Sequence, residues 1–404
     1  MLTNRQLFLL HLGQTSSSPL MVEVYRAEGI YLYGPSGEKY IDLISGVSVS
    51  NTGHRHPKVV DAVKKQMDSY LHLMVYGEMI QSPQVRYAAK LTELLPPELG
   101  VCYFVNSGSE AIEGAIKLAR KYTGRSRIIY FRNAYHGSTL GALSIQGSEK
   151  YKNAFRPLIP DTLCIDYNDL TALSFIDSHT ACVIAEPVQA EAGVICPDKG
   201  FLQKLKRKCS ENGALLVFDE VQTGFGRTGY LFAYENSGVI PDILVLAKAL
   251  GGGMPLGAFI SSHEIMPALC NNPQLGHITT FGGHPVCCAA GLASLEVILE
   301  NNLPATVNRK LSLFRKELIH PAIVEIRGAG LLMAVRLKNP EYVRYAVNHA
   351  PEHGLILDYF LFCDNSFRIA PPLIINDNEI ITACTQLKSL LDDTVKNCNR
   401  YGKI

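Results

Sequence analysis

Seven short apolar runs, rich in β-branched residues, alternate with helical patterns between residues 101 and 262. Continuous apolar strands that alternate with helices are typical of a mostly parallel sheet that is buried on both faces. The pattern predicts strands at 101–106, 127–131, 162–167, 181–187, 214–221, 243–248 and 257–262, and helices at 110–122 and 203–212. We therefore expect an α/β fold with a seven-stranded, mostly parallel sheet flanked by helices.

The pattern changes on both sides of this region. After about residue 290 a helix is followed by mixed elements, and residues 30–43 (IYLYGPSGEKYIDL) are typical of a hairpin. The chain has 404 residues, which exceeds the roughly 250–300 residues at which single cores usually divide. We predict a large domain at 46–290, a smaller α+β domain at 291–404, and an N-terminal segment at 1–45 that packs with the smaller domain.

Charge and cysteine content narrow the functional classes. The net charge is +1, so the chain lacks the large excess of positive charge that is typical of proteins that bind nucleic acid or an acidic membrane surface. The eleven cysteines contain no C-x-x-C pair, which favours free thiols in a reducing compartment. The apolar patch near the N-terminus is shorter than the core of a signal peptide. We expect a cytoplasmic protein that binds neither nucleic acid nor a membrane.

One lysine, Lys248, lies inside the apolar and glycine-rich run DILVLAKALGGGMPLGAFI (242–260). A lysine at the edge of an apolar strand can extend its ammonium into water. The run is too interrupted for a membrane span, which needs about 20 predominantly apolar residues. The third interpretation is chemical, because a desolvated lysine loses its proton easily and its neutral amine can attack a carbonyl to form a Schiff base.

Other polar residues stand at the ends of predicted strands, where open α/β sheets bind their ligands. FVNSGSE (104–110) leaves a strand and enters a helix, and its glycine lets backbone N–H groups approach an anion. Helix capping explains this stretch equally well. Glu186 and Asp219 follow two further strands, although a loop charge and a helix cap would account for them. An anion loop, an aspartate and a lysine at one sheet edge together indicate a pyridoxal phosphate site.

Six ordered motifs extend this interpretation over residues 106–285. They are NSGSEAIEGAIKLAR (106–120), AYHGSTLGALS (134–144), EPVQAEAGV (186–194), LLVFDEVQTGFGRTG (215–229), PDILVLAKALGGGMPLGA (241–258) and TTFGGHP (279–285). With these motifs the chain resembles the class III aminotransferases, the ornithine, acetylornithine and 4-aminobutyrate group of fold type I pyridoxal phosphate enzymes. The resemblance implies a transaminase that moves an amino group from a donor of these kinds to an α-keto acid, either 2-oxoglutarate or pyruvate.

The resemblance also assigns roles to matching positions. It makes Lys248 the residue that holds the cofactor aldehyde and Asp219 the partner of the ring nitrogen. The other cofactor-binding positions are Ser107, Gly108, Ser109, Tyr135, Val221, Gln222 and Thr280. In the family the counterpart of Thr280 comes from the partner subunit, so the resemblance implies a homodimer with shared active sites.

Arg368 resembles the arginine that binds a substrate carboxylate, and Glu186 resembles the catalytic carboxylate that neutralises it. One pocket must accept a terminal-amine donor and then a keto acid. We expect Glu186 to pair with Arg368 in the first case and to leave in the second, when the keto acid takes the arginine as a bidentate partner.

Three further positions concern the substrate. Val47 and Tyr76 are expected at the donor pocket, and Val47 stands where ornithine aminotransferases carry a tyrosine. Ser138 replaces the arginine of the related YHGRT motif, and we expect another arginine, such as Arg132, to compensate or 2-oxoglutarate to be poorly favoured. His54 and His56 are too few for a metal site, so no metal is predicted. A decarboxylase, an aminomutase and a protein that binds the cofactor without catalysis remain alternatives.

Overall fold

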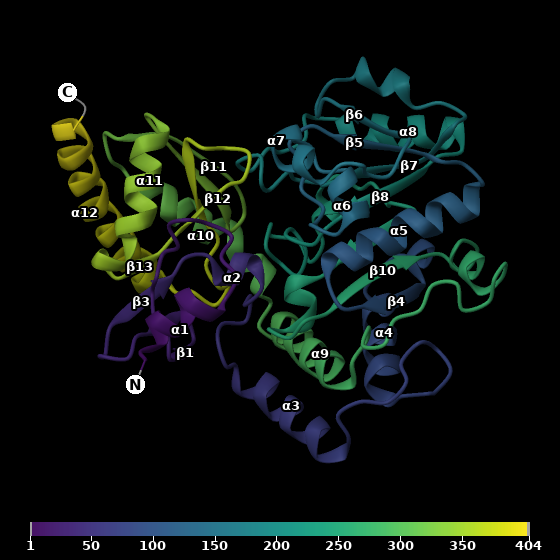
Figure 1. Cartoon of the computed structure of the whole chain (residues 1–404), viewed down its shortest axis with the longest axis horizontal. Helices are drawn as coiled ribbons and strands as arrows, with labels where there is room; N and C mark the ends of the chain where they lie inside the picture. Colours follow the sequence, from purple (N-terminus) through teal and green to yellow (C-terminus); the bar gives the residue numbers. More distant parts are fainter. Residues whose placement is uncertain (1, 402–404) are drawn as a thin grey trace.

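A seven-stranded sheet forms the centre of the larger part of the computed structural model, and the structure describes residues 2–401 (Figure 1). Its strand order is β4-β10-β9-β8-β7-β5-β6, and β10 runs antiparallel to both of its neighbours. The strands are β4 (Val101–Val105), β5 (Arg127–Phe131), β6 (Thr162–Ile165), β7 (Thr180–Ala185), β8 (Leu215–Asp219), β9 (Ile243–Leu246) and β10 (Gly257–Ser261). Each predicted run overlaps one of these strands, which confirms the mostly parallel α/β sheet.

Helices cover both faces of this sheet, which explains why its strands are continuously apolar. Alternate residues of one strand belong to different apolar clusters. Val217 packs in the cluster that contains α5 (Gly108–Thr123), while the next residue, Phe218, packs in the cluster that contains α8 (Phe201–Asn212). The other helices of this part are α3 (Pro57–Ser69), α4 (Ser82–Glu93), α6 (Leu140–Ser144), α7 (Glu149–Lys152) and α9 (Pro285–Glu300).

Both ends of the chain build the smaller part, which lies beside the large sheet (Figure 1). One of its sheets has the order β11-β12-β15-β14, with β11 (Ile323–Ala329), β12 (Leu332–Leu337), β14 (Asp358–Tyr359) and β15 (Ser366–Ile369). The other has the order β1-β2-β3-β13, with β1 (Arg26–Glu28), β2 (Tyr31–Tyr33), β3 (Lys39–Asp42) and β13 (Leu355–Ile356). Four helices complete it: α1 (Asn4–His11), α10 (Leu303–Glu317), α11 (Pro340–His349) and α12 (Asp377–Tyr401).

The N-terminal segment is joined to the C-terminal part by backbone hydrogen bonds. The predicted hairpin is present as the antiparallel pair β2 and β3, and β3 pairs in parallel with β13. This pairing favours the predicted division of the chain near residues 45 and 290, which stays a prediction.

A buried arginine fastens the smaller part to the larger one. Arg227 follows β8, and its Nη1 donates to the carbonyl oxygens of Leu331 (2.9 Å) and Pro371 (2.6 Å). Its Nη2 donates to Ser45 Oγ (3.2 Å) and Asn51 Oδ1 (2.5 Å). Burial lowers the pKa of Arg227 to about 9. These four hydrogen bonds hold the N-terminal segment and the strand that carries Arg368 against the large sheet.

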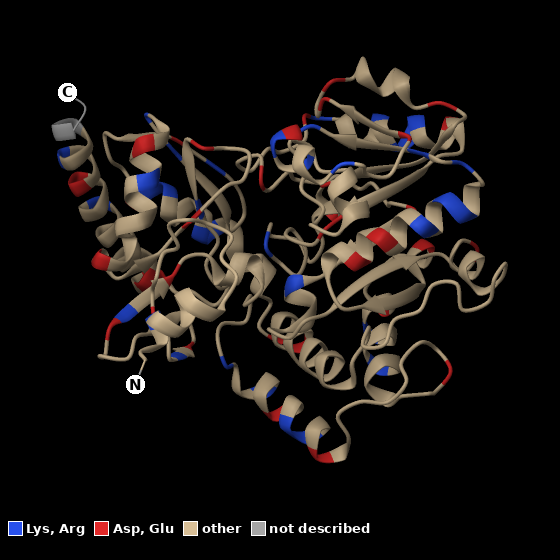
Figure 2. Cartoon of the chain, viewed as in Figure 1, with Lys and Arg blue, Asp and Glu red and all other residues tan. Residues whose placement is uncertain are grey.

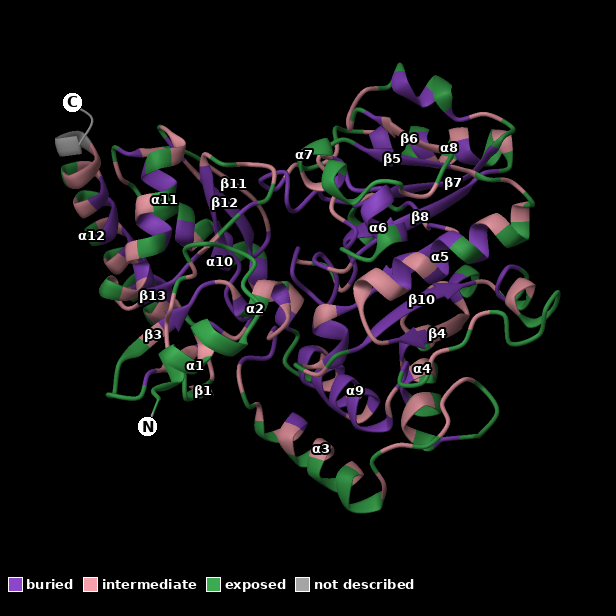
Figure 3. Cartoon of the chain, in the orientation of Figure 1, coloured by how far each residue is buried: buried purple, intermediate pink, exposed green. Residues whose placement is uncertain are grey.

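The strongly apolar helix α9 lies inside the protein. In the described part of the chain no single helix is long and apolar enough to cross a membrane. The helices α9 and α10 meet this requirement for length and composition only when they are taken together, and the angle between them is 68°. Figure 3 shows α9 as a mostly buried helix, and it packs against α3 and α4. Figure 2 shows basic and acidic residues interspersed over both parts of the chain.

Candidate active site

Three strands of the large sheet end at one cavity of about 450 Å³. Ser107 follows β4 as the N-cap of α5, Asp219 ends β8, and Lys248 follows β9. The lining residues are Val49, Asn106, Ser107, Gly108, Ser109, Tyr135, His136, Gly137, Glu186, Asp219, Val221, Gln222, Thr223, Ala247, Lys248, Gly253, Met254, Pro255 and Leu256. The structure therefore brings together most of the residues that the sequence singled out.

Lys248 is held at this cavity by an unusual backbone conformation. Its φ is 52°, in the left-handed region that residues with a Cβ seldom adopt. Burial lowers the pKa of its ammonium to about 8, although Glu191 acts in the opposite direction. A lysine whose pKa is lowered in this way has far more neutral amine near pH 7.5 than an ordinary lysine. The interpretation of Lys248 as a nucleophile thus has a physical basis.

Asp219 is paired with a histidine that the sequence did not single out. Its Oδ2 lies 2.7 Å from Nδ1 of His136, and its Oδ1 accepts the N–H of Val221 at 3.0 Å. The side chains are 5% and 0% exposed respectively. An ionised aspartate only accepts hydrogen bonds, so Nδ1 of His136 is the donor. His136 fixes the orientation of the Asp219 carboxylate at the floor of the cavity.

The first turn of α5 provides a site for an anion. The hydroxyl of Ser107 caps the helix by accepting the N–H of Glu110 at 3.2 Å. Gly137 packs closely against the first turn of α5. Its φ is 127°, and a Cβ at this position would lie 2.0 Å from Oγ of Ser109. Only glycine fits at 137. Backbone N–H groups at a helix N-terminus attract phosphate and carboxylate groups.

Tyr135, Val221 and Gln222 also line the cavity. The amide of Gln222 donates through Nε2 to Oε1 of Glu191 at 2.8 Å. Its Oε1 is buried without a partner among the described residues. A buried polar atom without a partner costs free energy, so this oxygen is suited to a donor group on a ligand.

The predicted pair of Glu186 and Arg368 is wrong. Both oxygens of Glu186 accept backbone N–H groups, of Tyr135 at 3.1 Å and of Ala190 at 2.9 Å. Burial raises the pKa of Glu186 to about 7, although His136 acts in the opposite direction. Glu186 lines the cavity but serves to fix the loop at 186–190.

The partner of Arg368 is Glu191, the second glutamate of the same motif. Nη2 of Arg368 lies 2.5 Å from Oε1 of Glu191, and the two side chains are 1% and 5% exposed. Glu191 stands beyond the turn that Glu186 fixes, which directs its side chain toward β15. Burial acts to raise the pKa of Glu191, but Arg368 and Lys248 outweigh it and the pKa is lowered. The predicted neutralisation of Arg368 therefore involves another residue.

The predicted donor-pocket residues do not line the 450 Å³ cavity within this chain. Val47 belongs to the turn Ser45–Ser48, in which all four residues have positive φ, and Val49 lines the cavity instead. Tyr76 lines a second cavity of about 350 Å³.

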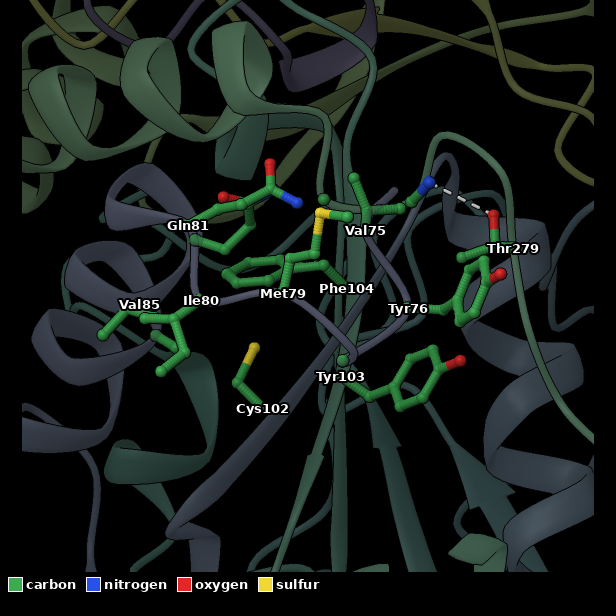
Figure 4. Close-up of a pocket in the computed structure, with 15 residues that line it drawn as sticks. Val75, Tyr76, Met79, Ile80, Gln81, Val85, Cys102, Tyr103, Phe104 and Thr279 are labelled. Atoms are coloured by element: carbon green, nitrogen blue, oxygen red, sulfur yellow. Dashed lines mark hydrogen bonds between the residues drawn. The ribbon is translucent and has the colours of Figure 1, made fainter. Parts of the chain in front are cut away.

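The second cavity adjoins the segment that contains Thr280. Figure 4 shows Tyr76 and Thr279 at its edge, with Thr279 accepting the N–H of Gly282. Thr280 is exposed and is absent from the lining of the 450 Å³ cavity, at least in the single chain described.

Ser138 lies beside the cavity and carries no charge. Its Oγ is 3.2 Å from the hydroxyl of Tyr135, and its N–H donates to Oγ of Ser109 at 3.2 Å. Arg132, named as one of two ways to account for Ser138, forms an ion pair with Asp166, and its side chain is 61% exposed. In the described chain no arginine lines the 450 Å³ cavity.

Sequence reasoning missed Glu191, His136 and Val49. Glu191 could have been found by weighing both glutamates of EPVQAE as partners of Arg368. His136 gave no comparable signal, because its contact with Asp219 spans 83 residues and depends on the sheet order.

The cavity fits pyridoxal phosphate group by group. The first turn of α5 would hold the phosphate, Asp219 the ring nitrogen, and the free Oε1 of Gln222 the ring hydroxyl. Tyr135 and Val221 would contact the ring, and the amine of Lys248 would hold the aldehyde carbon. When bound, this cofactor withdraws electrons from the substrate carbon and stores the amino group between two half-reactions.

Comparisons with known proteins agree with this fit. Residues 12–391 match the sequence profile of the family described as Aminotransferase class-III. The acetylornithine aminotransferase of Methanopyrus kandleri is 40% identical over 386 residues, which cover 94% of this chain and 96% of that protein. The acetylornithine aminotransferase of Streptomyces coelicolor is 38% identical and covers 94% of this chain and 93% of that protein.

Solved structures show the same likeness. The ornithine aminotransferase of Toxoplasma gondii has a TM-score of 0.89 and 30% identity, and covers 96% of this chain and 93% of that chain. An amine transaminase from an uncultivated Pseudomonas species, in its PLP-bound form, has a TM-score of 0.87 and 27% identity over 95% of this chain and 98% of that chain. The chain therefore belongs to the class III aminotransferases, and its cofactor is pyridoxal phosphate.

Proposed function

We propose that this transaminase accepts an amino group from a terminal-amine donor, of the ornithine, acylornithine or ω-amino-acid kind, and passes it to 2-oxoglutarate or pyruvate. The observation that carries the proposal is the pair of Arg368 and Glu191. A buried arginine that is neutralised by a carboxylate can tolerate a donor with no carboxylate near the ring. The relatives named as acetylornithine and ornithine aminotransferases support this donor class.

The proposed roles follow from the positions of the side chains. Lys248 binds the cofactor and then moves a proton between the substrate carbon and the cofactor, because burial lowers the pKa of its amine to about 8. Asp219 holds a proton at the ring nitrogen, oriented by His136. Glu191 leaves Arg368 when a keto acid binds, and the guanidinium then takes the substrate carboxylate through two N–H groups.

The cofactor's visible absorption tests the donor class directly. We expect purified enzyme, without a keto acid, to convert its cofactor to the amine form with 1,5-diaminopentane, 5-aminopentanoate or N-acetylornithine. Alanine and other donors that lack a terminal amine should react more slowly. No spectral change with any amine would contradict the proposed function, and release of carbon dioxide would indicate a decarboxylase instead.

We expect the acceptor half-reaction to discriminate weakly between 2-oxoglutarate and pyruvate. Ser138 is too short and uncharged to bind the distal carboxylate of 2-oxoglutarate, and Arg132 is engaged with Asp166. A charge-assisted hydrogen bond contributes about 1.5–3 kcal/mol, so Ser138→Arg should raise the kcat/KM ratio of 2-oxoglutarate to pyruvate by about 10–150-fold. A strong wild-type preference for 2-oxoglutarate that the arginine leaves unchanged would contradict this prediction.

We also infer a homodimer in which Thr280 of the partner subunit completes each cofactor site. Thr280 is exposed and does not line the cavity of its own chain. Large apolar side chains near it are also exposed, including Ile278 (51%), Phe281 (54%) and Ile80 (96%). Exposed apolar side chains that gather near one segment are typical of a protein interface, and a second copy of the chain would cover them.

Hybrid dimers test the shared site. Each site would take Lys248 from one subunit and Thr280 from the other. In a hybrid dimer of one Lys248→Ala subunit and one Thr280→Ala subunit, one site therefore carries both substitutions and the other site carries neither. Statistical mixing should restore about one quarter of the wild-type activity, measured where cofactor does not saturate the Thr280→Ala enzyme. A monomer in light scattering, or a mixture no more active than its components, would contradict the shared site.

We place the enzyme in the cytoplasm. The support for this is the cysteine content, because all eleven cysteines are free thiols in the structure. Free thiols persist in a reducing compartment.

A further inference from the structure

A third cavity, of about 790 Å³, lies at the amino ends of the parallel strands β5 and β7. Among its lining residues, Arg127 begins β5 and His179 directly precedes β7. The cofactor cavity lies at the carboxyl ends of the strands, and the two cavities share no lining residue. Helix α5 connects them, because it begins at the cofactor cavity and ends at this one, and its 16 residues span roughly 24 Å.

Positive charge is in excess around this third cavity, which we name the basic cavity. Its basic lining residues are Arg120, Lys121, Arg125 and Arg127. The lining contains a single carboxylate, that of Asp161. Arg127 is neutralised, because it forms ion pairs with Asp161 at 3.3 Å and with Asp177 at 2.8 Å. The other three cations form no ion pair with any residue that the structure describes, although the net charge of the whole chain is only +1.

Carbonyl oxygens, rather than carboxylates, hold Arg125 in place. Its Nη1 donates to the carbonyl oxygens of Thr180 at 3.1 Å, Asn212 at 2.7 Å and Gly213 at 3.0 Å. A carbonyl group has no net charge, so these hydrogen bonds fix the guanidinium without neutralising it. Its Nε and Nη2 form no hydrogen bond with the described residues. The remaining N–H groups of a fixed guanidinium are therefore available to an anion.

The last turn of α5 supplies the other two cations (Figure 2). Arg120 donates to the carbonyl oxygens of Ser126 at 2.9 Å and Pro160 at 3.1 Å. Lys121 donates to the carbonyl oxygen of Asn271. The C-terminal end of a helix carries about half a negative charge. This partial charge favours basic residues at the end of α5, but it is too small to neutralise both of them.

We propose that the basic cavity is a binding site for a diphosphate group, either of a nucleotide or of inorganic pyrophosphate. A guanidinium binds a phosphate group through two parallel N–H···O hydrogen bonds, and an ammonium adds a point charge. Three cations without carboxylate partners match an anion with several negative charges better than they match a single carboxylate. The basic cavity is also larger than the 450 Å³ cavity that fits pyridoxal phosphate, so it has room for a nucleotide. This inference does not depend on the proposed amine donor.

Side chains, not the backbone, would recognise the anion at this site. The end of α5 presents carbonyl oxygens, which repel an anion, whereas the start of the same helix presents N–H groups, which attract one. The basic cavity therefore differs in kind from the phosphate site of the cofactor, and its affinity for an anion depends on Arg120, Lys121 and Arg125. Because the attraction is between charges, we expect this affinity to fall as the ionic strength rises.

Isothermal titration calorimetry with pyrophosphate tests the site. The holoenzyme is first reduced with borohydride, so that the cofactor and its phosphate stay in the other anion site. We expect one pyrophosphate per subunit with a Kd below about 1 mM at low ionic strength. Inorganic phosphate should bind at least about 10-fold more weakly, because it forms fewer charge-assisted hydrogen bonds. Equal affinities for ADP and pyrophosphate would assign the site to the diphosphate group alone, and a higher affinity for ADP would assign it to a nucleotide.

Two variants each remove one of the cations. Lys121→Gln and Arg125→Gln should weaken pyrophosphate binding by about 10-fold or more. Lys121 is exposed, so its variant should fold even if Arg125→Gln, which loses three hydrogen bonds to carbonyl oxygens, does not. Arg207→Gln is the matched control, because the side chain of Arg207 is 71% exposed on α8 and does not line the basic cavity.

The control variant should bind pyrophosphate as the wild-type enzyme does. All three variants should keep the wild-type rate of transamination without an added anion, because none of these residues lines the cofactor cavity. The inference would be overturned by the absence of binding, or by equal affinities for phosphate and pyrophosphate. An unchanged affinity in Lys121→Gln, or the same loss of affinity in Arg207→Gln, would also overturn it.

Discussion

Lys248→Ala is expected to abolish transamination. The amine of Lys248 both binds the cofactor and moves the proton, and no described lysine other than Lys248 lines the cavity. Proton transfer alone contributes about 10²–10⁴-fold to enzymatic rates, and loss of the nucleophile should add to that loss. The measurement is kcat together with the cofactor's lysine-linked absorption, which should disappear. Borohydride reduction and peptide mapping of the wild-type enzyme should label Lys248.

Lys248→Arg is the matched control, because arginine keeps the positive charge but is not a nucleophile at neutral pH. It should be as inactive as the alanine variant if the amine itself is required. The rate of cofactor binding by the apoenzyme should rise with pH and level off above about 8, because the lowered pKa of Lys248 sets where the neutral amine predominates. A label on another lysine, or a binding rate that still rises near pH 10, would contradict this assignment.

The large sheet could be predicted because both of its faces are buried by helices. Strands such as β7 and β8 are then buried at every position and apolar except for one end residue, Thr180 in β7 and Asp219 in β8, which makes the runs conspicuous in the sequence. Turns with positive φ were not predictable in this way. Val47 is β-branched and would ordinarily avoid a φ of 64°, yet the hydrogen bonds between Arg227 and the segment at 45–51 hold that turn. Tertiary contacts there outweigh the local preference of the residue.

In the candidate site, the groups that directly follow strands could be predicted, and the groups that loops position could not. Some groups of the site directly follow strands, namely Lys248, Asp219 and the first turn of α5. The prediction of the strands therefore also predicted where these groups lie. The neutralisation of Arg368 depends on how a loop turns after β7, which no periodicity encodes. The assignment of Glu186 as the partner of Arg368 failed for that reason, because Glu186 instead accepts backbone N–H groups of the loop.

Asp219→Asn should leave an enzyme that folds and binds its cofactor but turns over at least about 10²–10³-fold more slowly, in line with the loss of a positioned charge at a reacting centre. An amide cannot hold a proton at the ring nitrogen, so the ring no longer accepts charge from the substrate carbon. Cofactor binding should persist, because the phosphate site on α5 and Lys248 are unchanged. The measurement is the rate of the first half-reaction in a single turnover.

Asp42→Asn is the matched control, since the chain contains a second buried aspartate with a histidine at the same distance. Asp42 Oδ2 lies 2.7 Å from Nε2 of His54, and its side chain is 2% exposed, but it does not line the cavity. Losing that charge should lower the free energy of unfolding, because Oδ1 of Asp42 also accepts the N–H groups of Ile44 and Ser45. The single-turnover rate should stay near the wild-type value. A comparable rate loss in both variants would mean that Asp219 acts through stability alone, and a near wild-type rate in Asp219→Asn would contradict its assigned role at the ring nitrogen.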